Sequence, residues 1–391
     1  MLVTNNSSLI IVHCLSFIIY PESVKGLITR VDCTRGGRYT QNMASLTETA
    51  YYARKTIHYG ILALVFLIVG KIVLNLAIDI YRKINPPPPP PPTVGFGKLP
   101  AIEFPSKDRP RLTLKLETIS DALPEFDDQT KVYLMPVALP NLLGLERATQ
   151  VAAKLGFLFE PVAQSNRLFE FNKASPVPSR LEYDIITGNF LLHVAWFNDP
   201  DFLKQKFLPS EPQAIAEAKG YLRTAELLAE GLAESDVTVT PLKAKGIELE
   251  RAVSLSEADF IQIDLFRQPL EADKPNITPV KTEGVVRVII SGSREQGERV
   301  IYTKYDYYPV NAAGFETYPL KTTQAAWEEL MNGSGYIVSS DKNEGQATVR
   351  SVKLGYFDAY EPQNYFQPVY IFEGDDNFTA VVPAIDPVWI Q

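Results

Sequence analysis

Cysteine is nearly absent from this chain of 391 residues. Both cysteines, Cys14 and Cys33, lie close to the N-terminus, and the sequence from residue 34 onward has none. A disulfide framework, a thiol nucleophile and a cysteine-based metal site are therefore excluded from the rest of the chain. Lack of cysteine is compatible with every cellular compartment, so it does not indicate one.

Histidine is also scarce, and His193 is the single histidine after residue 58. A zinc or copper site there would need a shell of carboxylates, which these metals disfavour. His193 stands in the apolar run 189–197. For such a run we expect a histidine of the core or of a strand edge, and not a catalytic base or a metal ligand.

Motifs of common catalytic sites are missing too. The sequence has neither a Gly-x-Ser-x-Gly elbow nor a phosphate-binding P-loop. The acidic pairs at 127–128 and 375–376 lack the spaced oxygen ligands of an EF-hand and are expected in solvated turns. These absences predict a protein that is not an enzyme and has no cofactor or metal ion. A glycosidase-like carboxylate pair stays open, because its geometry is set by the fold.

Positive charge is in short supply after the first quarter of the chain. Residues 98–391 carry 29 Lys and Arg against 42 Asp and Glu, a net charge of −13. Nucleic acid is bound mainly through neutralisation of its phosphates, so this part of the chain is not expected to bind it. An anionic lipid surface would also repel it.

One long hydrophobic run is present, at residues 57–80. A helix of about 20 mostly apolar residues crosses a bilayer, so this run is predicted to be a transmembrane helix, with the membrane as its partner. Lys71, Asn75 and Asp79 interrupt it at a spacing that places them on one helical face. Either this face contacts a partner helix, or Lys71 snorkels and the apolar residues alone carry insertion.

The sequence before this run has two parts. Residues 1–42 are a doubtful extension with one short apolar run, and either translation begins at Met43 or these residues form a disordered tail. Residues 43–56 then form a short cytoplasmic tail. Lys and Arg are balanced across the helix, so the orientation follows by analogy with uncleaved signal anchors. We expect the chain in the cytoplasmic membrane, with its large C-terminal domain extracytoplasmic.

Seven consecutive prolines follow the helix, at residues 86–92. A polyproline II rod of this length extends about 20 Å. Its position beside the membrane favours a spacer over a ligand for an aromatic-lined groove. Residues 81–110 are therefore predicted to be a spacer and linker.

The rest of the chain predicts an α+β fold, divided into a first unit at 111–235 and a second at 236–391. Hydrophobic periodicity predicts helices at 143–155, 211–232 and 322–331. Gly156 is expected to end the first helix, Ser210 to cap the second, and Thr322 or Thr323 to cap the third. Strands are expected at 112–119, 131–137, 157–161, 167–171, 180–184, 189–197, 260–266, 284–291, 299–308, 347–356, 365–373 and 377–384. At both ends one helix precedes an antiparallel meander, which leaves a duplicated helix-plus-meander unit as an open alternative.

Three C-terminal segments resemble a known family: 352–357 (VKLGYF), 367–374 (QPVYIFEG) and 378–385 (FTAVVPAI). They are similar to membrane-anchored regulatory proteins of the YycH/YycI type and, more broadly, to PepSY-like units. This resemblance implies a short cytoplasmic tail, one helix and an extracytoplasmic α+β domain. Such relatives modulate a sensor kinase through helix contacts, without catalysis. The proline run departs from that pattern.

Tyrosine is dense between residues 302 and 370. Tyr302, Tyr305, Tyr307 and Tyr308 are the best candidates for a binding surface, although strands also use tyrosine structurally. The leading hypothesis is a non-catalytic, membrane-anchored regulatory domain of the cell envelope that binds a protein partner. The alternatives are a module for cell-wall glycan or peptide, and an envelope enzyme of unrecognised type.

Overall fold

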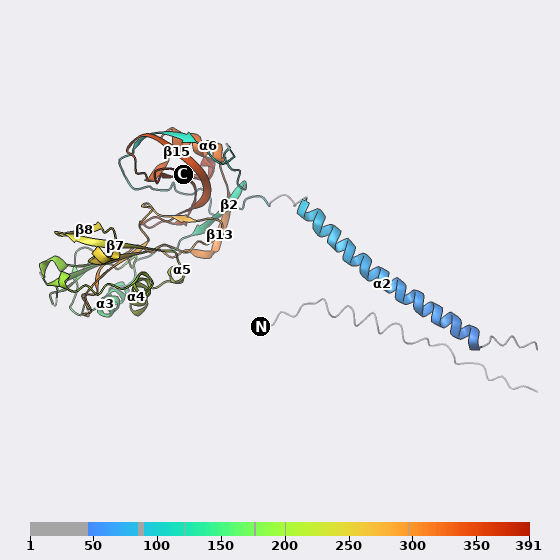
Figure 1. The fold of residues 1–391 in the computed structure, drawn as a ribbon, viewed down its shortest axis with the longest axis horizontal. Coiled ribbons are helices and arrows are strands. Elements are labelled where there is room, and N and C mark those ends of the chain that lie inside the picture. The colour runs from blue at the N-terminus through green and yellow to red at the C-terminus, as the bar shows by residue number, and fades with distance from the viewer. Residues whose placement is uncertain (1–45, 85–89, 121, 176, 200, 296) are drawn as a thin grey trace, which may run out of the picture. The chain divides into compact units, whose positions relative to one another are not determined.

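The computed structural model describes residues 46–84, 90–120, 122–175, 177–199, 201–295 and 297–391 (Figure 1). The chain divides into two compact units, Met1–Pro89 and Pro90–Gln391. The predicted extension at 1–42, the proposed start at Met43 and the first prolines of the predicted rod lie outside the described residues.

The first unit contains one long helix, α2 (Leu46–Ile84). Its segment Thr49–Lys83 is long and apolar enough to cross a membrane, and its side chains are not buried against other parts of the chain. The helix includes residues 46–56, so it begins before the predicted span at residue 57. It ends just before the proline run, because a proline disfavours helical backbone in the residue that precedes it.

The largest sheet of the second unit has nine strands among the described residues. All neighbouring strands in it are antiparallel. Their order across the sheet is β3 (Val162–Ala163), β4 (Leu168–Lys173), β5 (Ser179–Asp184), β6 (Phe190–Val194), β12 (Val300–Tyr305), β11 (Val286–Ser291), β9 (Phe260–Leu265), β7 (Val237–Lys245) and β8 (Glu248–Arg251).

Three helices pack on one face of this sheet: α3 (Gly144–Lys154), α4 (Glu211–Thr224) and α5 (Glu230–Ala233) (Figure 1). A capping box between Ser210 and Gln213 starts α4, and the helix buries Ala214, Ala218 and Leu222 on the sheet. The predicted helix 211–232 is wrong in its length. The chain leaves the helix at Thr224 and passes through a positive φ of 60° at Glu226 before α5 begins.

Two smaller sheets complete the second unit. In the six-stranded sheet, the main path runs β1 (Arg111–Leu116), β15 (Glu344–Phe357), β17 (Pro368–Gly374), β18 (Thr379–Pro383) and β14 (Tyr336–Ser339), and β10 (Asn276–Ile277) pairs with β15. The three-stranded sheet contains β13 (Asn311–Pro319), β2 (Gln129–Leu134) and β16 (Tyr365–Phe366). Helix α6 (Thr323–Met331) packs on the six-stranded sheet, capped by the Thr322 side chain as predicted.

The second unit is a mixed α+β body with mostly antiparallel sheets, as predicted, but duplication of a helix-plus-meander unit is not shown. The predicted boundary at 235/236 does not separate two compact units. It falls inside the nine-stranded sheet, where β12 pairs with β6, and β1 likewise pairs with β15 across the boundary. Local patterns reveal where strands are but not which distant strand each one joins.

The predicted linker also needs correction, because its later residues belong to the folded body. Leu99 is fully buried, and the Phe104 ring stacks on Tyr336 with ring centroids 5.2 Å apart. The Arg109 guanidinium donates a hydrogen bond to the Leu330 carbonyl at 3.0 Å. Any spacer therefore ends well before residue 110.

Candidate functional site

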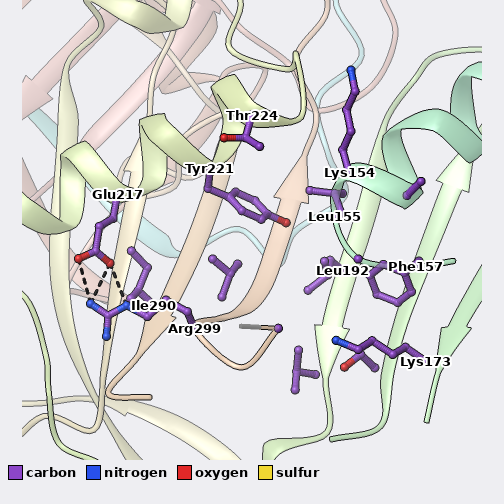
Figure 2. Close-up of a pocket in the computed structure, with 16 residues that line it drawn as sticks. Lys154, Leu155, Phe157, Lys173, Leu192, Glu217, Tyr221, Thr224, Ile290 and Arg299 are labelled. Atoms are coloured by element: carbon purple, nitrogen blue, oxygen red, sulfur yellow. Dashed lines mark hydrogen bonds and ion pairs between the residues drawn. The ribbon is translucent and has the colours of Figure 1, made fainter. Parts of the chain in front are cut away.

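A pocket of about 600 Å³ lies between α3, α4 and the helix-covered face of the nine-stranded sheet (Figure 2). Its apolar walls come from the segment at the end of α3 and from the three strands β6, β11 and β12. These residues are Leu155, Phe157, Leu192, Val194, Ile290 and Val300. Ligand pockets in proteins have volumes of about 300–1,000 Å³ and mostly apolar walls with a few polar groups. The cavity is therefore a candidate for a small-molecule site.

The end of α3 shapes one wall of the pocket. Gly156 has a φ of 90°, a left-handed conformation that favours glycine and stops the helix, as the sequence predicts. The Phe157 amide then donates a hydrogen bond to the Ala152 carbonyl at 2.8 Å. This reversal directs Phe157 into the core, where it is buried.

Two of the three cationic side chains that line the pocket are already paired. The Arg299 guanidinium forms two hydrogen bonds with the Glu217 carboxylate, at 2.8 and 3.0 Å, and also donates to the Ser291 carbonyl at 2.7 Å. Lys154 lies 2.8 Å from the Glu226 carboxylate. These two cations are held by the protein itself.

Lys173, at the end of β4, differs from them. The Lys173 side chain is half-buried, and its ammonium group has no ion-pair or hydrogen-bond partner among the described residues. The Nζ atom lies against Gly297, where an added Cβ would come within 2.3 Å of it. Figure 2 shows Lys173 extending into the pocket. Glycine at 297 thus leaves room for the ammonium group at the pocket.

Hydroxyl groups supply the other polar atoms of the pocket. Tyr221 extends from α4, and Thr303 donates a hydrogen bond of 3.4 Å to its oxygen. Burial raises the pKa of the Tyr221 hydroxyl, so it remains protonated at neutral pH. The Ser179 hydroxyl donates to the Val177 carbonyl at 2.8 Å and keeps lone pairs for another donor.

The described residues contain no group of three or more His, Cys, Asp and Glu side chains arranged to hold a metal ion. The pocket combines apolar walls, one uncompensated cation and the hydroxyl-bearing residues Ser179, Tyr221 and Thr224. This arrangement suits binding of an amphipathic molecule. Sequence reasoning missed it, because its lining residues lie between positions 153 and 300 and no motif connects them.

A second feature is the exposed apolar segment that follows β2 and includes the first two residues of α3, which we call the 137–145 loop. Leu142 is fully exposed and Leu139 is 73% exposed, and Val137, Leu143 and Leu145 are exposed as well. The Asn141 side chain accepts a hydrogen bond from the Leu143 amide at 2.9 Å and so fixes a turn. In the sequence, the apolar residues around two prolines were the one feature that could have indicated this loop. Their exposure could not be predicted from the sequence.

The four tyrosines proposed as a binding surface do not form one exposed face. Tyr305 is buried, and its hydroxyl donates to the Leu227 carbonyl at 2.9 Å. Tyr307 packs beneath the guanidinium group of Arg267. Tyr308 accepts a hydrogen bond from Asn189, and Tyr302 is half-buried on the opposite face of β12 from Tyr305. These contacts favour the structural explanation of the tyrosine cluster.

His193 is neither a core histidine nor an edge histidine, which corrects the prediction. It is exposed on β6, between β5 and β12, with Arg180 and Tyr302 as its cross-strand neighbours. Loss of hydration on the sheet, and then the charge of Arg180, lower the pKa of His193.

Lys71, Asn75 and Asp79 are exposed on α2, within the continuous helix. Their spacing puts them on one helical face, as predicted. No second helix in the described part of the chain is shown against them, so their role stays a prediction.

The C-terminal segments that carry the family resemblance form β15, β17 and β18. Leu354 and Val369 lie in different hydrophobic clusters, so these strands contribute to two separate parts of the core. Gly355 permits a close backbone approach, as predicted, since an added Cβ would lie 2.3 Å from the Pro275 carbonyl oxygen. These residues build the sheet and do not reach the pocket.

Comparisons with known proteins identify no family. No model of a known protein family matches the chain, and no curated protein matches it. Among solved structures, an uncharacterized protein from Eubacterium rectale is similar at 11% sequence identity and a TM-score of 0.33. The match covers 70% of this chain and 89% of that protein.

Proposed function

We propose that this chain is a non-catalytic, membrane-anchored regulatory protein that binds a partner protein of the cell envelope through the 137–145 loop. Helix α2 is the anchor in this proposal, and the body lies on the extracytoplasmic side of the cytoplasmic membrane. The resemblance of the C-terminal segments to regulators of the YycH/YycI type supports the same role. The observation that carries the proposal is the exposure of the loop.

The physical argument rests on the density of exposed apolar side chains. Five large aliphatic residues are exposed within nine positions of the loop. Single exposed apolar residues are normal, but a contiguous patch is typical of an interaction site. Burial of each such side chain stabilises a complex by about 1.5–3 kcal/mol. The loss of translational, rotational and side-chain freedom on association offsets part of this gain.

Charge favours a protein over a lipid surface as the occupant of the loop. The body carries a net charge of −13 over residues 98–391, which anionic lipids repel. In the proposal, the face with Lys71, Asn75 and Asp79 provides a second contact, to a helix of the partner within the membrane. A buried lysine there would pair with a carboxylate of that helix.

The direct test is a photo-crosslinking amino acid at Leu142, in the full chain in native membranes. We expect one discrete protein adduct. The same amino acid at Ile247 is the matched control, because Ile247 is also 70% exposed, alone on the turn between β7 and β8. Adducts only with lipid, only with a second copy of this chain, or identical at both positions would contradict the proposal.

Substitution provides an independent test of the same contact. Leu139→Glu combined with Leu142→Glu should abolish the adduct without loss of folding, because both side chains are exposed. Ile247→Glu should leave it unchanged. Reporter fusions at the two ends of the chain test the proposed orientation separately.

A further inference from the structure

We propose that the pocket between α3, α4 and the nine-stranded sheet binds a small amphipathic carboxylate, with the carboxylate on Lys173 and an apolar body against the surrounding walls. This inference is independent of the protein partner proposed above. The structure supports it through the unpaired ammonium group, the composition of the walls and the size of the cavity.

The charge of the ligand follows from the state of the three cations. Glu217 neutralises Arg299 and Glu226 neutralises Lys154, whereas Lys173 has no partner among the described residues. A half-buried charge without a partner is unfavourable, because it loses hydration and gains no compensating contact. An anion in the pocket would supply that contact.

The position of the Lys173 side chain depends on the backbone at residue 297. Its Nζ occupies the space that a side chain at residue 297 would fill, and Gly297 has a φ of 86°. Figure 2 shows the side chains of Lys173 and Tyr221 entering the pocket from different elements, β4 and α4. The cation and the hydroxyl therefore contribute to one shared cavity.

Apolar contacts define the rest of the ligand. Phe157 and Leu192 lie beside Lys173 in the pocket, and Ile290 lies farther toward α4 (Figure 2). Val300 also lines the pocket. A volume of about 600 Å³ accommodates a molecule larger than a bare inorganic anion. The Tyr221 hydroxyl, kept protonated by burial, provides one further donor. A carboxylate on an aromatic or branched aliphatic body satisfies these features together.

The test uses the full chain in lipid nanodiscs, with empty nanodiscs as the background. The probes are naphthalene-2-carboxylate, the uncharged naphthalene-2-carboxamide and 2-naphthyl phosphate, and binding is measured by equilibrium dialysis. We expect the carboxylate to bind the wild type more tightly than either of the other two probes. Equal binding of the carboxylate probe to empty nanodiscs and to nanodiscs that contain the protein would overturn the proposal.

Lys173→Met should weaken carboxylate binding about tenfold or more, the effect of losing a hydrogen bond between charged groups. Carboxamide binding should not change. Lys243→Met is the matched control, since Lys243 is an exposed lysine on β7 and lies outside the pocket. Equal loss in both variants, or no loss with Lys173→Met, would overturn the assignment of Lys173.

Lys173→Arg should retain most carboxylate binding, because it keeps the positive charge. Phosphate binding that exceeds carboxylate binding tenfold or more would overturn the carboxylate class and assign a phosphate monoester. Circular dichroism of each variant verifies that the fold is retained. Failure of the photo-crosslinking test would leave these results unaffected, because no probe in them depends on a partner protein.

Discussion

Removal of one partner of the Arg267–Asp358 ion pair should be among the most destabilising single substitutions in the body. Both side chains are only 2% exposed. Arg267 Nε donates to the Asp358 carboxylate at 2.9 Å, and Arg267 Nη2 donates to the Tyr308 carbonyl at 2.6 Å. Arg267 follows β9 of the nine-stranded sheet and Asp358 follows β15 of the six-stranded sheet. The pair therefore joins the two largest sheets.

The expected magnitude follows from the burial of both charges. Burial alone would lower the pKa of Arg267, but the Asp358 carboxylate outweighs it and the pKa is raised. Removing one partner of a buried pair leaves an uncompensated charge and typically costs about 3–5 kcal/mol. With a urea m-value of about 2–3 kcal/mol/M, Asp358→Asn should lower the unfolding midpoint by about 1–2 M.

Urea denaturation of residues 90–391, followed by far-UV circular dichroism and tryptophan fluorescence, measures this effect. Arg267→Met with Asp358→Leu should recover much of the loss, because no charge is then left unpaired. Glu250→Gln is the control, since the Lys245–Glu250 pair is exposed to solvent and should contribute little to stability. A loss below about 1 kcal/mol for Asp358→Asn would refute the reasoning.

Three further substitutions test other parts of the body. Gly355→Ala should destabilise the body by about 1–3 kcal/mol in the same assay, because the new Cβ would collide with the Pro275 carbonyl. Gly220→Ala on α4 is the control: its Cβ would meet nothing within 4 Å, so this substitution should be neutral or stabilising. Thr322→Ala removes the side-chain cap of α6 and should cost about 1 kcal/mol, measured as a lower urea midpoint; an unchanged midpoint would contradict the capping role. Lost hydration lowers the pKa of His193 in the folded chain. As pH falls, the His193 imidazole therefore becomes protonated in the unfolded chain before it does in the folded chain. Stability should therefore decrease as pH falls below about 6.5, and His193→Gln should reduce that slope; an unchanged slope would contradict the shift.

Several elements could be predicted from sequence because their causes are local. The apolar run of α2 needs no other part of the chain to become a helix that can cross a membrane. The Ser210 and Thr322 caps begin α4 and α6 as predicted. The antiparallel hairpin of β11 and β12 also follows the prediction, since its strands are neighbours in sequence.

The candidate sites depended on contacts between distant residues. Sequence periodicity shows that Tyr302 and Tyr305 point to opposite faces of a strand, but not that one of those faces is covered by helices. It shows a lysine at 173, but not that Glu217 and Glu226 neutralise the other two cations of the pocket and leave this one unpaired.

The sequence by itself determined that α2 is long and apolar enough to cross a membrane, where α4 and α6 begin, and the acidic, cysteine-free composition of the body. Tertiary structure alone decided that strands on both sides of residue 235 share one sheet, that the 137–145 loop is exposed and that Lys173 faces a cavity. The reason is physical: backbone propensity and hydration act over a few residues, whereas strand partners and burial depend on which distant segments pack together.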